Sequence, residues 1–309
     1  MKKTLDIYII VFSGLLLSTC TTPTKNAGDS QRVEAAAVVK KISYKHIIFA
    51  PVAESLLVRG IDTIFLRQLL DDDRVAFKEN LTRYNVTGYR NPPDYSHNYN
   101  EKSVKKAKEF LNNNNDALLS AENAYGVPKE VIASILWIET KFGAILGKNN
   151  VPSVFLSVAM ANQPEYLAMN KDNLRKNWTG TSDELQELDL KIERRSQKKS
   201  AWALDELMAL DTLRRRSPFH PLELYGSAAG AFGLSQFLPS SYLRWAKDGN
   251  GDNVINLFEL RDAMHSIGNY LKTNGWGATR EQKEKAVFHY NNSKDYVAAV
   301  LTLADKIKR

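Results

Sequence analysis

The chain has 309 residues, 43% of them hydrophobic and 25% charged, which is an ordinary composition for a soluble protein of one large or two modest domains. Lysine and arginine outnumber aspartate and glutamate by 42 to 35, and the net charge of +7 favours an anionic partner such as nucleic acid, anionic lipid or cell-wall polymer. The sequence has no zinc finger, RNP-type aromatic motif or basic heptad array, which argues against nucleic acid. The single cysteine, Cys20, excludes an intramolecular disulfide.

The N-terminus has the features of a secretory signal. Residues 1–3 are positively charged, and residues 7–17 are almost wholly apolar but too short to span a bilayer. Leu17-Ser18-Thr19-Cys20 resembles a bacterial lipobox, in which the cysteine becomes the lipidated N-terminus. Because Thr19 departs from that pattern, the alternative is an ordinary signal peptide with a chance cysteine. We predict a lipoprotein-type signal peptide over residues 1–19 and lipidation at Cys20.

The next part of the chain carries weak signals. We expect residues 20–60 to form a tether, rich in Thr, Asn, Gly and Ser, followed by a segment without a clear pattern. Apolar residues at helical spacing predict a helix over Ile61 to Leu70, and a second helix is possible up to Tyr84. Glu101 to Tyr125 reads as one long helix, with a solvated turn or a break in the asparagine run Asn112 to Asn115.

A helix with one carboxylate on its apolar stripe is predicted between Gly126 and Gly143, in the sequence GVPKEVIASILWIETKFG. Glu139 continues the apolar stripe of Ile132, Ile135 and Leu136. Burial and the negative end of the helix dipole both favour the neutral acid, which is the form that a general acid needs at neutral pH. The alternative is that the stripe ends before Glu139 and that its side chain is solvated.

The remaining helical patterns indicate a mainly α protein. Pro152 and Ser153 can start a helix, and Glu165 to Arg216 is charged and mainly helical in pattern, ending at Pro218. Strand signals are scarce, and no repeat of 20–50 residues is present in the sequence.

A glycine-rich turn follows at Gly226, and three glycines fall within eight residues before Gln236 and Pro239. Glycines let the backbone approach a ligand closely, and Ser227 and Gln236 are uncharged donors and acceptors that suit a ligand rich in hydroxyl and amide groups. The sequence lacks the Lys-Ser/Thr that follows the glycines of a phosphate loop. Tight helix packing through small residues is the alternative.

Residues 248–259 match an EF-hand loop. Oxygen-bearing side chains stand at positions 1, 3, 5 and 12, and position 7 offers its backbone carbonyl. Asn253 replaces the usual glycine, but asparagine also tolerates a left-handed backbone. We therefore predict a structural Ca²⁺ site, and a solvated polar loop is the alternative. The predicted ligands are Asp248, Asn250, Asp252, Val254 and Glu259.

Tyr290 and Asn291 end a predicted helix, and Ser293 can cap the next one. At a helix junction these two residues place an aromatic ring and an amide on one edge. The alternative is a helix end with a core tyrosine.

Taken together, these segments resemble the bacterial lytic transglycosylases, in particular their membrane-bound type B. Glu139-Thr140-Lys141-Phe142-Gly143 is similar to the catalytic Glu-Thr motif of that family. The segment from Gly226 to Tyr242, the calcium loop and Tyr290-Asn291 are similar to its other motifs, in the same order. The similarity covers about residues 61–308, so we expect the catalytic region to span 61–309.

The resemblance implies a mainly α, lysozyme-like fold of the goose-type and lytic transglycosylase kind, with an EF-hand-like calcium loop and an extra helical subdomain. It implies that Glu139 is the single catalytic acid and base in cleavage of peptidoglycan glycan strands, with no organic cofactor. It also implies a periplasmic protein anchored to the outer membrane through its lipid. The residues that the resemblance places along the sugar are Ser227, Gln236, Tyr290, Asn291, Phe142 and Tyr225.

Two rival functions stay open from the sequence. A goose-lysozyme-like hydrolase uses a similar glutamate but delivers water to the broken bond. A non-enzymatic lipoprotein that binds calcium and glycan requires Glu139 to be incidental.

Overall fold

A computed structural model describes residues 44–88, 93–176 and 178–308. The predicted signal peptide and Cys20 lie outside the described residues. The described part is mainly helical, and none of its helices is long and apolar enough to cross a membrane. The elements are α2 (Tyr44–Ile48), α3 (Ala50–Val58), α4 (Thr63–Asp71), α5 (Glu79–Thr87), η2 (Ser96–Tyr99), α6 (Glu101–Asn113), α7 (Asn115–Tyr125), α8 (Lys129–Thr140), β1 (Asn149–Asn150), α9 (Val151–Ala159), η3 (Met160–Asn162), α10 (Pro164–Arg175), α11 (Ser182–Leu213), η4 (Pro221–Glu223), β2 (Tyr225–Gly226), α12 (Pro239–Trp245), α13 (Leu260–Thr273), α14 (Arg280–Tyr290) and α15 (Lys294–Lys308).

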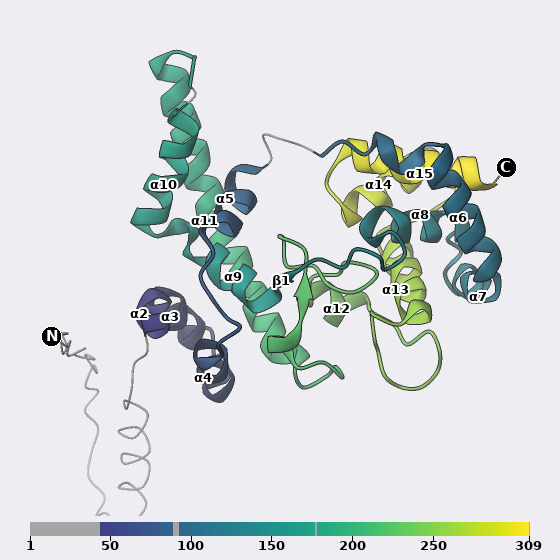
Figure 1. The fold of residues 1–309 in the computed structure, drawn as a ribbon, viewed down its shortest axis with the longest axis horizontal. Coiled ribbons are helices and arrows are strands. Elements are labelled where there is room, and N and C mark those ends of the chain that lie inside the picture. The colour runs from purple at the N-terminus through teal and green to yellow at the C-terminus, as the bar shows by residue number, and fades with distance from the viewer. Residues whose placement is uncertain (1–43, 89–92, 177, 309) are drawn as a thin grey trace, which may run out of the picture. The chain divides into compact units, whose positions relative to one another are not determined.

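Helix α8 lies inside a group of helices formed by α6, α7, α13 and α15 (Figure 1). The sequence predicted one apolar stripe on α8, but the structure buries every residue from Val131 to Trp137. A helix enclosed on all sides is held by packing, so the position of its last turn is fixed by its neighbours. Glu139 lies in that last turn and is partly exposed.

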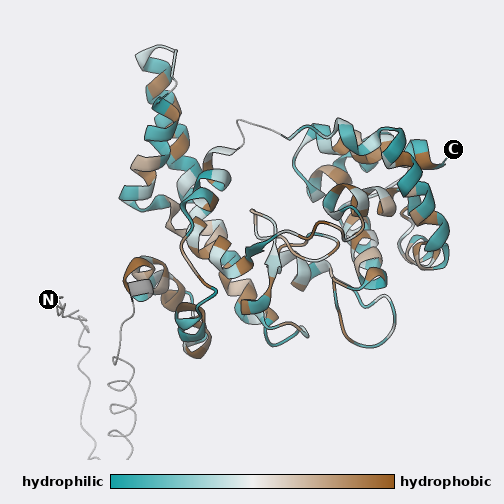
Figure 2. Ribbon diagram, viewed as in Figure 1, coloured by the Kyte–Doolittle hydropathy of each residue, from teal (hydrophilic) through white to brown (hydrophobic). Residues whose placement is uncertain are grey.

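A second group of helices packs around α9, whose nine residues are all buried. Helix α11 runs across α9, and α10 lies beside the first part of α11 (Figure 1). Figure 2 shows hydrophobic and hydrophilic residues in turn along α11, which is the pattern of a helix with one buried and one solvated face. One continuous apolar core joins both groups, from Phe49 to Ile307.

Two strands of two residues each connect the groups. β1 pairs with β2 in antiparallel register, with Asn149 opposite Gly226 and Asn150 opposite Tyr225. The side chain of Asn150 caps α9 by accepting from the amide of Ser153, and it donates to the carbonyl of Leu222 at 2.8 Å. The start of the glycine-rich segment is therefore fixed to the start of a buried helix.

The predicted helix over 101–125 is two helices in the structure. The break is at Asn114, whose side chain donates to the carbonyl of Phe110 at 3.0 Å. An asparagine amide that bonds the backbone competes with the helical hydrogen bonds, which explains why the break falls in the asparagine run.

Candidate active site

The last turn of α8 is anchored on both sides of Glu139. The hydroxyl of Thr140 donates to the carbonyl of Leu234 at 3.2 Å, which ties the helix to the glycine-rich segment. Lys141 ends the helix in the left-handed conformation, with φ of 52°, and its ammonium group donates to the side chain of Asn98 and to the carbonyl of Trp137. These contacts fix the backbone from which the Glu139 side chain extends.

The carboxylate of Glu139 has one direct hydrogen-bond donor. The hydroxyl of Tyr296, a residue of α15 that is 1% exposed, donates to Oε1 of Glu139 at 2.6 Å. Burial raises the pKa of Glu139 from 4.5 to about 7, while the Tyr296 hydrogen bond and the charge of Lys141 act in the opposite direction. Burial is the larger effect, so Glu139 is close to half protonated at neutral pH. A carboxyl group with this pKa can both donate and accept a proton.

Three tyrosines form a cluster around this hydrogen bond. The rings of Tyr290 and Tyr296 are nearly parallel at 6.5 Å, and the ring of Tyr95 meets that of Tyr296 edge-on at 5.6 Å. The side chain of Asn291 lies close enough to the hydroxyl of Tyr95 to lower its pKa. Burial raises the pKa of Tyr95 to about 12 and raises the pKa values of Tyr290 and Tyr296 well above the usual value of a tyrosine, so all three hydroxyls are neutral donors at physiological pH.

The glycine-rich segment reaches this cluster through Tyr290, whose hydroxyl donates to the carbonyl of Ser235 at 2.5 Å. The next residue, Gln236, has a left-handed backbone with φ of 49°, and its amide donates to the carbonyl of Gly233 at 2.9 Å. Gly233 itself has φ of 75°, and a Cβ there would lie 2.6 Å from Leu257. This glycine is therefore needed both for its conformation and for space.

The other predicted sugar-lining residues make contacts of their own. Ser227 accepts from the amide of Ala231 at 3.2 Å within its own turn, and Tyr225 is 42% exposed on β2. Phe142 stacks on Phe110, with ring centroids 3.7 Å apart. The structure thus brings Tyr290 and Asn291 to the Glu139 cluster, while Phe142 packs against α6.

Two members of the site were not predicted as such. The sequence patterns assign no role in the site to Tyr296 or to Tyr95. A tyrosine on an apolar stripe carries a hydroxyl that needs a partner when buried, and this is the signal that could have identified Tyr296.

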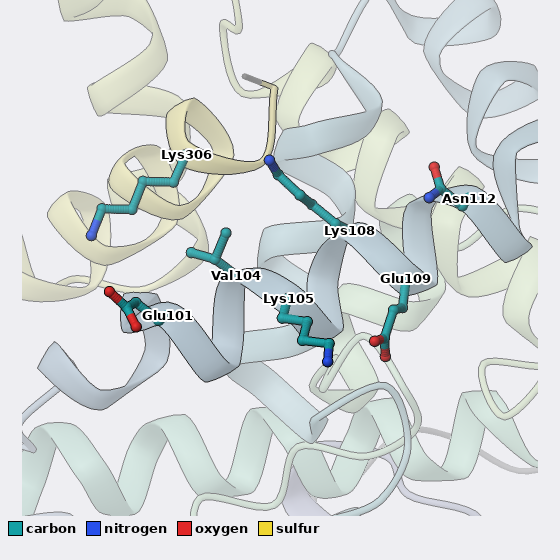
Figure 3. A pocket seen from close by; sticks show the side chains of 7 residues that line it. All are labelled: Glu101, Val104, Lys105, Lys108, Glu109, Asn112 and Lys306. Carbon is teal, nitrogen blue, oxygen red and sulfur yellow. The ribbon is translucent and has the colours of Figure 1, made fainter.

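A groove of about 650 Å³ between α6 and α15 does not belong to this site. Figure 3 shows that its lining side chains, among them Lys105, Lys108 and Lys306, extend in different directions. The groove contains neither Glu139 nor any of the tyrosines around it. A catalytic centre needs convergent groups, so the groove is not a candidate.

The predicted calcium loop connects α12 to α13, and its side-chain oxygens are held by its own backbone. Asp248 accepts from the amides of Gly251 and Asn253, both at 2.7 Å, and Asp252 accepts from the amide of Val254 at 2.8 Å. Asn253 has φ of 66°, which confirms the left-handed backbone predicted at that position.

The ends of the loop are joined by Asp262, a residue that is fully buried. Its carboxylate accepts from the amides of Gly249 at 2.8 Å and Asn256 at 2.6 Å. Glu259 accepts from the amide of Asp262 as the N-cap of α13. Hard oxygen donors gathered in one turn fit a Ca²⁺ ion. Among the residues that the structure describes, no three His, Cys, Asp or Glu side chains form a metal-binding group.

Comparison with known families supports the resemblance seen in the sequence. The family model for the transglycosylase SLT domain matches residues 59–288. The chain belongs to this transglycosylase family. The matched residues contain Glu139, the glycine-rich segment and the calcium loop.

Relatives of this transglycosylase SLT domain include the membrane-bound lytic murein transglycosylase B of Escherichia coli (strain K12), which is 33% identical over 174 residues. That alignment covers 56% of this chain and 39% of the relative's own length. The chain thus spans less than half of this curated relative.

Solved structures share the fold. An Escherichia coli lytic transglycosylase in complex with calcium has a TM-score of 0.62 and 21% identity, covering 86% of this chain and 93% of that one. The Pseudomonas aeruginosa protein SltB3, in complex with NAG-NAM-pentapeptide, has a TM-score of 0.62 and 17% identity, covering 85% and 79%. The predicted mainly α fold of the lytic transglycosylase kind is therefore confirmed.

Proposed function

We propose that this protein is a lytic transglycosylase that cleaves the β-1,4 bond between N-acetylmuramic acid and N-acetylglucosamine in peptidoglycan. The observation that carries the proposal is Glu139, whose pKa is about 7 and whose carboxylate is held by Tyr296 within a transglycosylase SLT domain. The lytic murein transglycosylase activity of the Escherichia coli relative and the NAG-NAM-pentapeptide bound to the Pseudomonas aeruginosa protein agree with this substrate.

The mechanism uses Glu139 twice. Protonated Glu139 donates its proton to the glycosidic oxygen as the bond to C1 of the muramic residue breaks, and the N-acetyl oxygen of that residue stabilises the positive carbon. Ionised Glu139 then accepts the proton of the C6 hydroxyl while O6 bonds to C1, so a 1,6-anhydro ring forms and no water is consumed. No carboxylate is among the groups that shift the pKa of Glu139, which is consistent with a substrate-assisted reaction.

The neighbours of Glu139 divide into those that hold it and those that hold the sugar. Tyr296 orients the carboxylate and stabilises its charged form. We assign Asn291 and the ring of Tyr290 to the sugar next to the reacting bond, because Tyr290 belongs to the tyrosine cluster and Asn291 lies next to it in the chain and close to Tyr95. The predicted contacts of Ser227, Gln236, Phe142 and Tyr225 with more distant sugars stay predictions.

For the loop over 248–259 we propose a structural Ca²⁺ ion, held by the side chains of Asp248, Asn250, Asp252 and Glu259 and by the carbonyl of Val254. The calcium complex of the Escherichia coli structure supports this choice of ion. When bound there, Ca²⁺ would supply positive charge to offset the carboxylates of Asp248, Asp252 and Glu259 at the junction between α12 and α13.

We place the protein in the periplasm, attached to the outer membrane by lipid on Cys20. Support comes from the lipobox-like sequence and from the membrane-bound relative.

The test is digestion of purified sacculi by the full mature chain with calcium present, followed by mass spectrometry of the products. Anhydro-muropeptides, one water lighter than lysozyme products, are expected from the wild type. Glu139→Gln should retain glycan binding and lose cleavage, whereas Glu130→Gln, at the start of the same helix, should cleave normally. Reducing-end products would identify a hydrolase instead, and an active Glu139→Gln variant would contradict the assigned acid.

A further inference from the structure

Asn98, in η2, is a buried asparagine to which the mechanism above gives no role. It is 2% exposed. Its side-chain NH₂ group donates to the carbonyl of Tyr95 at 3.2 Å, and its side-chain oxygen accepts from the ammonium group of Lys141. Its backbone carbonyl accepts from the indole N–H of Trp137 at 3.1 Å. A residue this deeply buried is out of reach of a sugar, so any effect on the reaction passes through its partners.

The two side-chain hydrogen bonds of Asn98 complete a closed series of contacts around Glu139. The carboxylate accepts from the hydroxyl of Tyr296, whose ring meets that of Tyr95 edge-on at 5.6 Å. The carbonyl of Tyr95 and the ammonium group of Lys141 are both held by the Asn98 side chain. Lys141 follows Glu139 by two residues, so the series returns to its start. Asn98 thus links the donor side of the site to the end of α8.

The backbone that carries Asn98 is fixed to two neighbouring helices. The hydroxyl of Ser103 in α6 donates to the carbonyl of His97 at 2.9 Å, and the ammonium group of Lys306 in α15 donates to the carbonyl of Tyr99 at 2.9 Å. Helix α15 also supplies the hydrogen bond to the catalytic carboxylate. The Asn98 side chain therefore extends from a rigid base that is tied to the same helix as the donor.

Lys141 is the strained member of the series. Its φ of 52° lies in the left-handed region, which costs energy for a residue with a side chain. Its ammonium group lies over the ring of Trp137 at 4.7 Å and donates to the carbonyl of the same residue at 3.1 Å. Together with the hydrogen bond to Asn98, these contacts hold the turn that ends α8. Shortening the Asn98 side chain releases the ammonium group on one side of this turn.

We infer that Asn98 is a positioning residue, which fixes how Glu139 meets its hydrogen-bond donor Tyr296. It does so by holding the Tyr95 carbonyl and the Lys141 ammonium group in one arrangement, the first on the side of the donor and the second on the side of the carboxylate. A small displacement of a catalytic group can slow a reaction by about 100-fold. This inference rests on the proposed function for the identity of the reaction.

The test measures kcat and KM of the full mature chain from the release of 1,6-anhydro ends from peptide-free glycan strands. Asn98→Ala should lower kcat about 10-fold and leave KM within about twofold, because a displaced carboxylate affects the transition state more than the binding of the sugar. Asn114→Ala is the matched control, since it also removes an asparagine side chain that bonds a backbone carbonyl. It should leave kcat and KM unchanged, and thermal unfolding shows whether each variant is folded.

A double-mutant cycle shows whether Asn98 acts through Lys141. Lys141→Met keeps most of the side-chain stem and removes the ammonium group, and it should lower kcat without raising KM. Because Asn98→Ala already releases this group, the kcat of the double variant should lie within about twofold of the lower single variant. Asn98→Ser, whose side chain is too short to reach both partners, takes the place of Asn98→Ala in the cycle if the alanine variant does not fold.

Three outcomes with an active wild type would overturn the inference and leave the proposed function in place. The first is a wild-type kcat in Asn98→Ala. The second is a double variant whose loss equals the product of the two single losses, since the two residues would then act independently. The third is an equal loss of kcat in Asn114→Ala, which would show a general effect of lowered stability. A wild type that yields no anhydro products contradicts the proposed function itself, and the inference falls with it.

Discussion

Tyr296 donates a hydrogen bond to Glu139 and thereby stabilises the charged form of a side chain whose neutral form is favoured by burial. The two influences oppose each other, and the resulting pKa of about 7 lets one group serve as acid and then as base. Removing the hydroxyl oxygen of Tyr296 should therefore change the pKa of Glu139.

Replacing Tyr296 with phenylalanine removes the donor, so the pKa of Glu139 should rise above about 7. Hydrogen bonds to charged groups contribute about 1.5–3 kcal/mol, which corresponds to a shift of roughly one to two pH units. Since the first step needs protonated Glu139, the alkaline limb of the kcat/KM profile should move upward, while the maximal rate falls because the carboxyl group loses its orientation. Tyr242→Phe, which removes a hydroxyl bound to the carbonyl of Ile255, is the control and should leave the profile in place. An alkaline limb that does not move in Tyr296→Phe would show that this bond does not set the pKa.

At high pH, the charged side chain of Glu139 should lower the free energy of unfolding. Its pKa is 4.5 in the unfolded chain and about 7 in the folded one, so the folded state binds the extra proton between these values. Stability therefore falls as pH rises from 4.5 to 7, and the full cost is present above pH 7. At pH 8, urea unfolding should give Glu139→Gln a free energy of unfolding about 1–3 kcal/mol above that of the wild type, a figure that allows for the partial exposure of the side chain. This difference should vanish near pH 4.5. Glu130→Gln, which removes a carboxylate at the start of the same helix, is the matched control. An equal effect of Glu139→Gln at both pH values would contradict the raised pKa.

Local sequence patterns were sufficient to predict the positions of Glu139 and Asn253. Glu139 was identifiable because its spacing from Ile135 and Leu136 is set by one helix. Asn253 was identifiable because the loop around it is continuous in sequence. Both predictions depend on residues within about a dozen positions, where the backbone geometry is regular enough to place side chains.

Tyr296 could not be assigned in this way. It lies 157 residues after Glu139, and its position on α15 is that of an ordinary core residue. Only the packing of α15 against α8 brings the hydroxyl to the carboxylate. Tyr95 is a similar case, since it directly precedes η2, which packs against the distant helix α15.

The calcium loop predicts that the stability of the protein differs between calcium and chelator. If the site binds Ca²⁺ with a dissociation constant on the order of 10⁻⁴ M, as extracellular modules do, about 10 mM calcium should stabilise the protein by about 2.7 kcal/mol. Asp248→Ala should abolish this gain in thermal unfolding, and calorimetry should detect no calcium binding to that variant. Asp262→Asn should lower stability with calcium or with chelator, because Asp262 joins the two ends of the loop directly. A wild-type unfolding temperature that is the same in calcium and in chelator would remove the calcium proposal.

Phe142, in the turn after Glu139, has two candidate roles: packing that holds the turn, and contact with the sugar. Lys141, Phe142 and Gly143 have φ values of 52°, 59° and 93°, a conformation that costs energy for the two residues with side chains. The stack of Phe142 on Phe110 holds this turn. Phe142→Ala should therefore lower the free energy of unfolding by about 2–4 kcal/mol and reduce kcat, because the turn orients the end of α8. Phe110→Ala removes the same stack from α6 and should reproduce both effects if Phe142 acts through packing. If Phe142→Ala instead raises KM and Phe110→Ala does not, then Phe142 contacts the sugar, as the family resemblance implies.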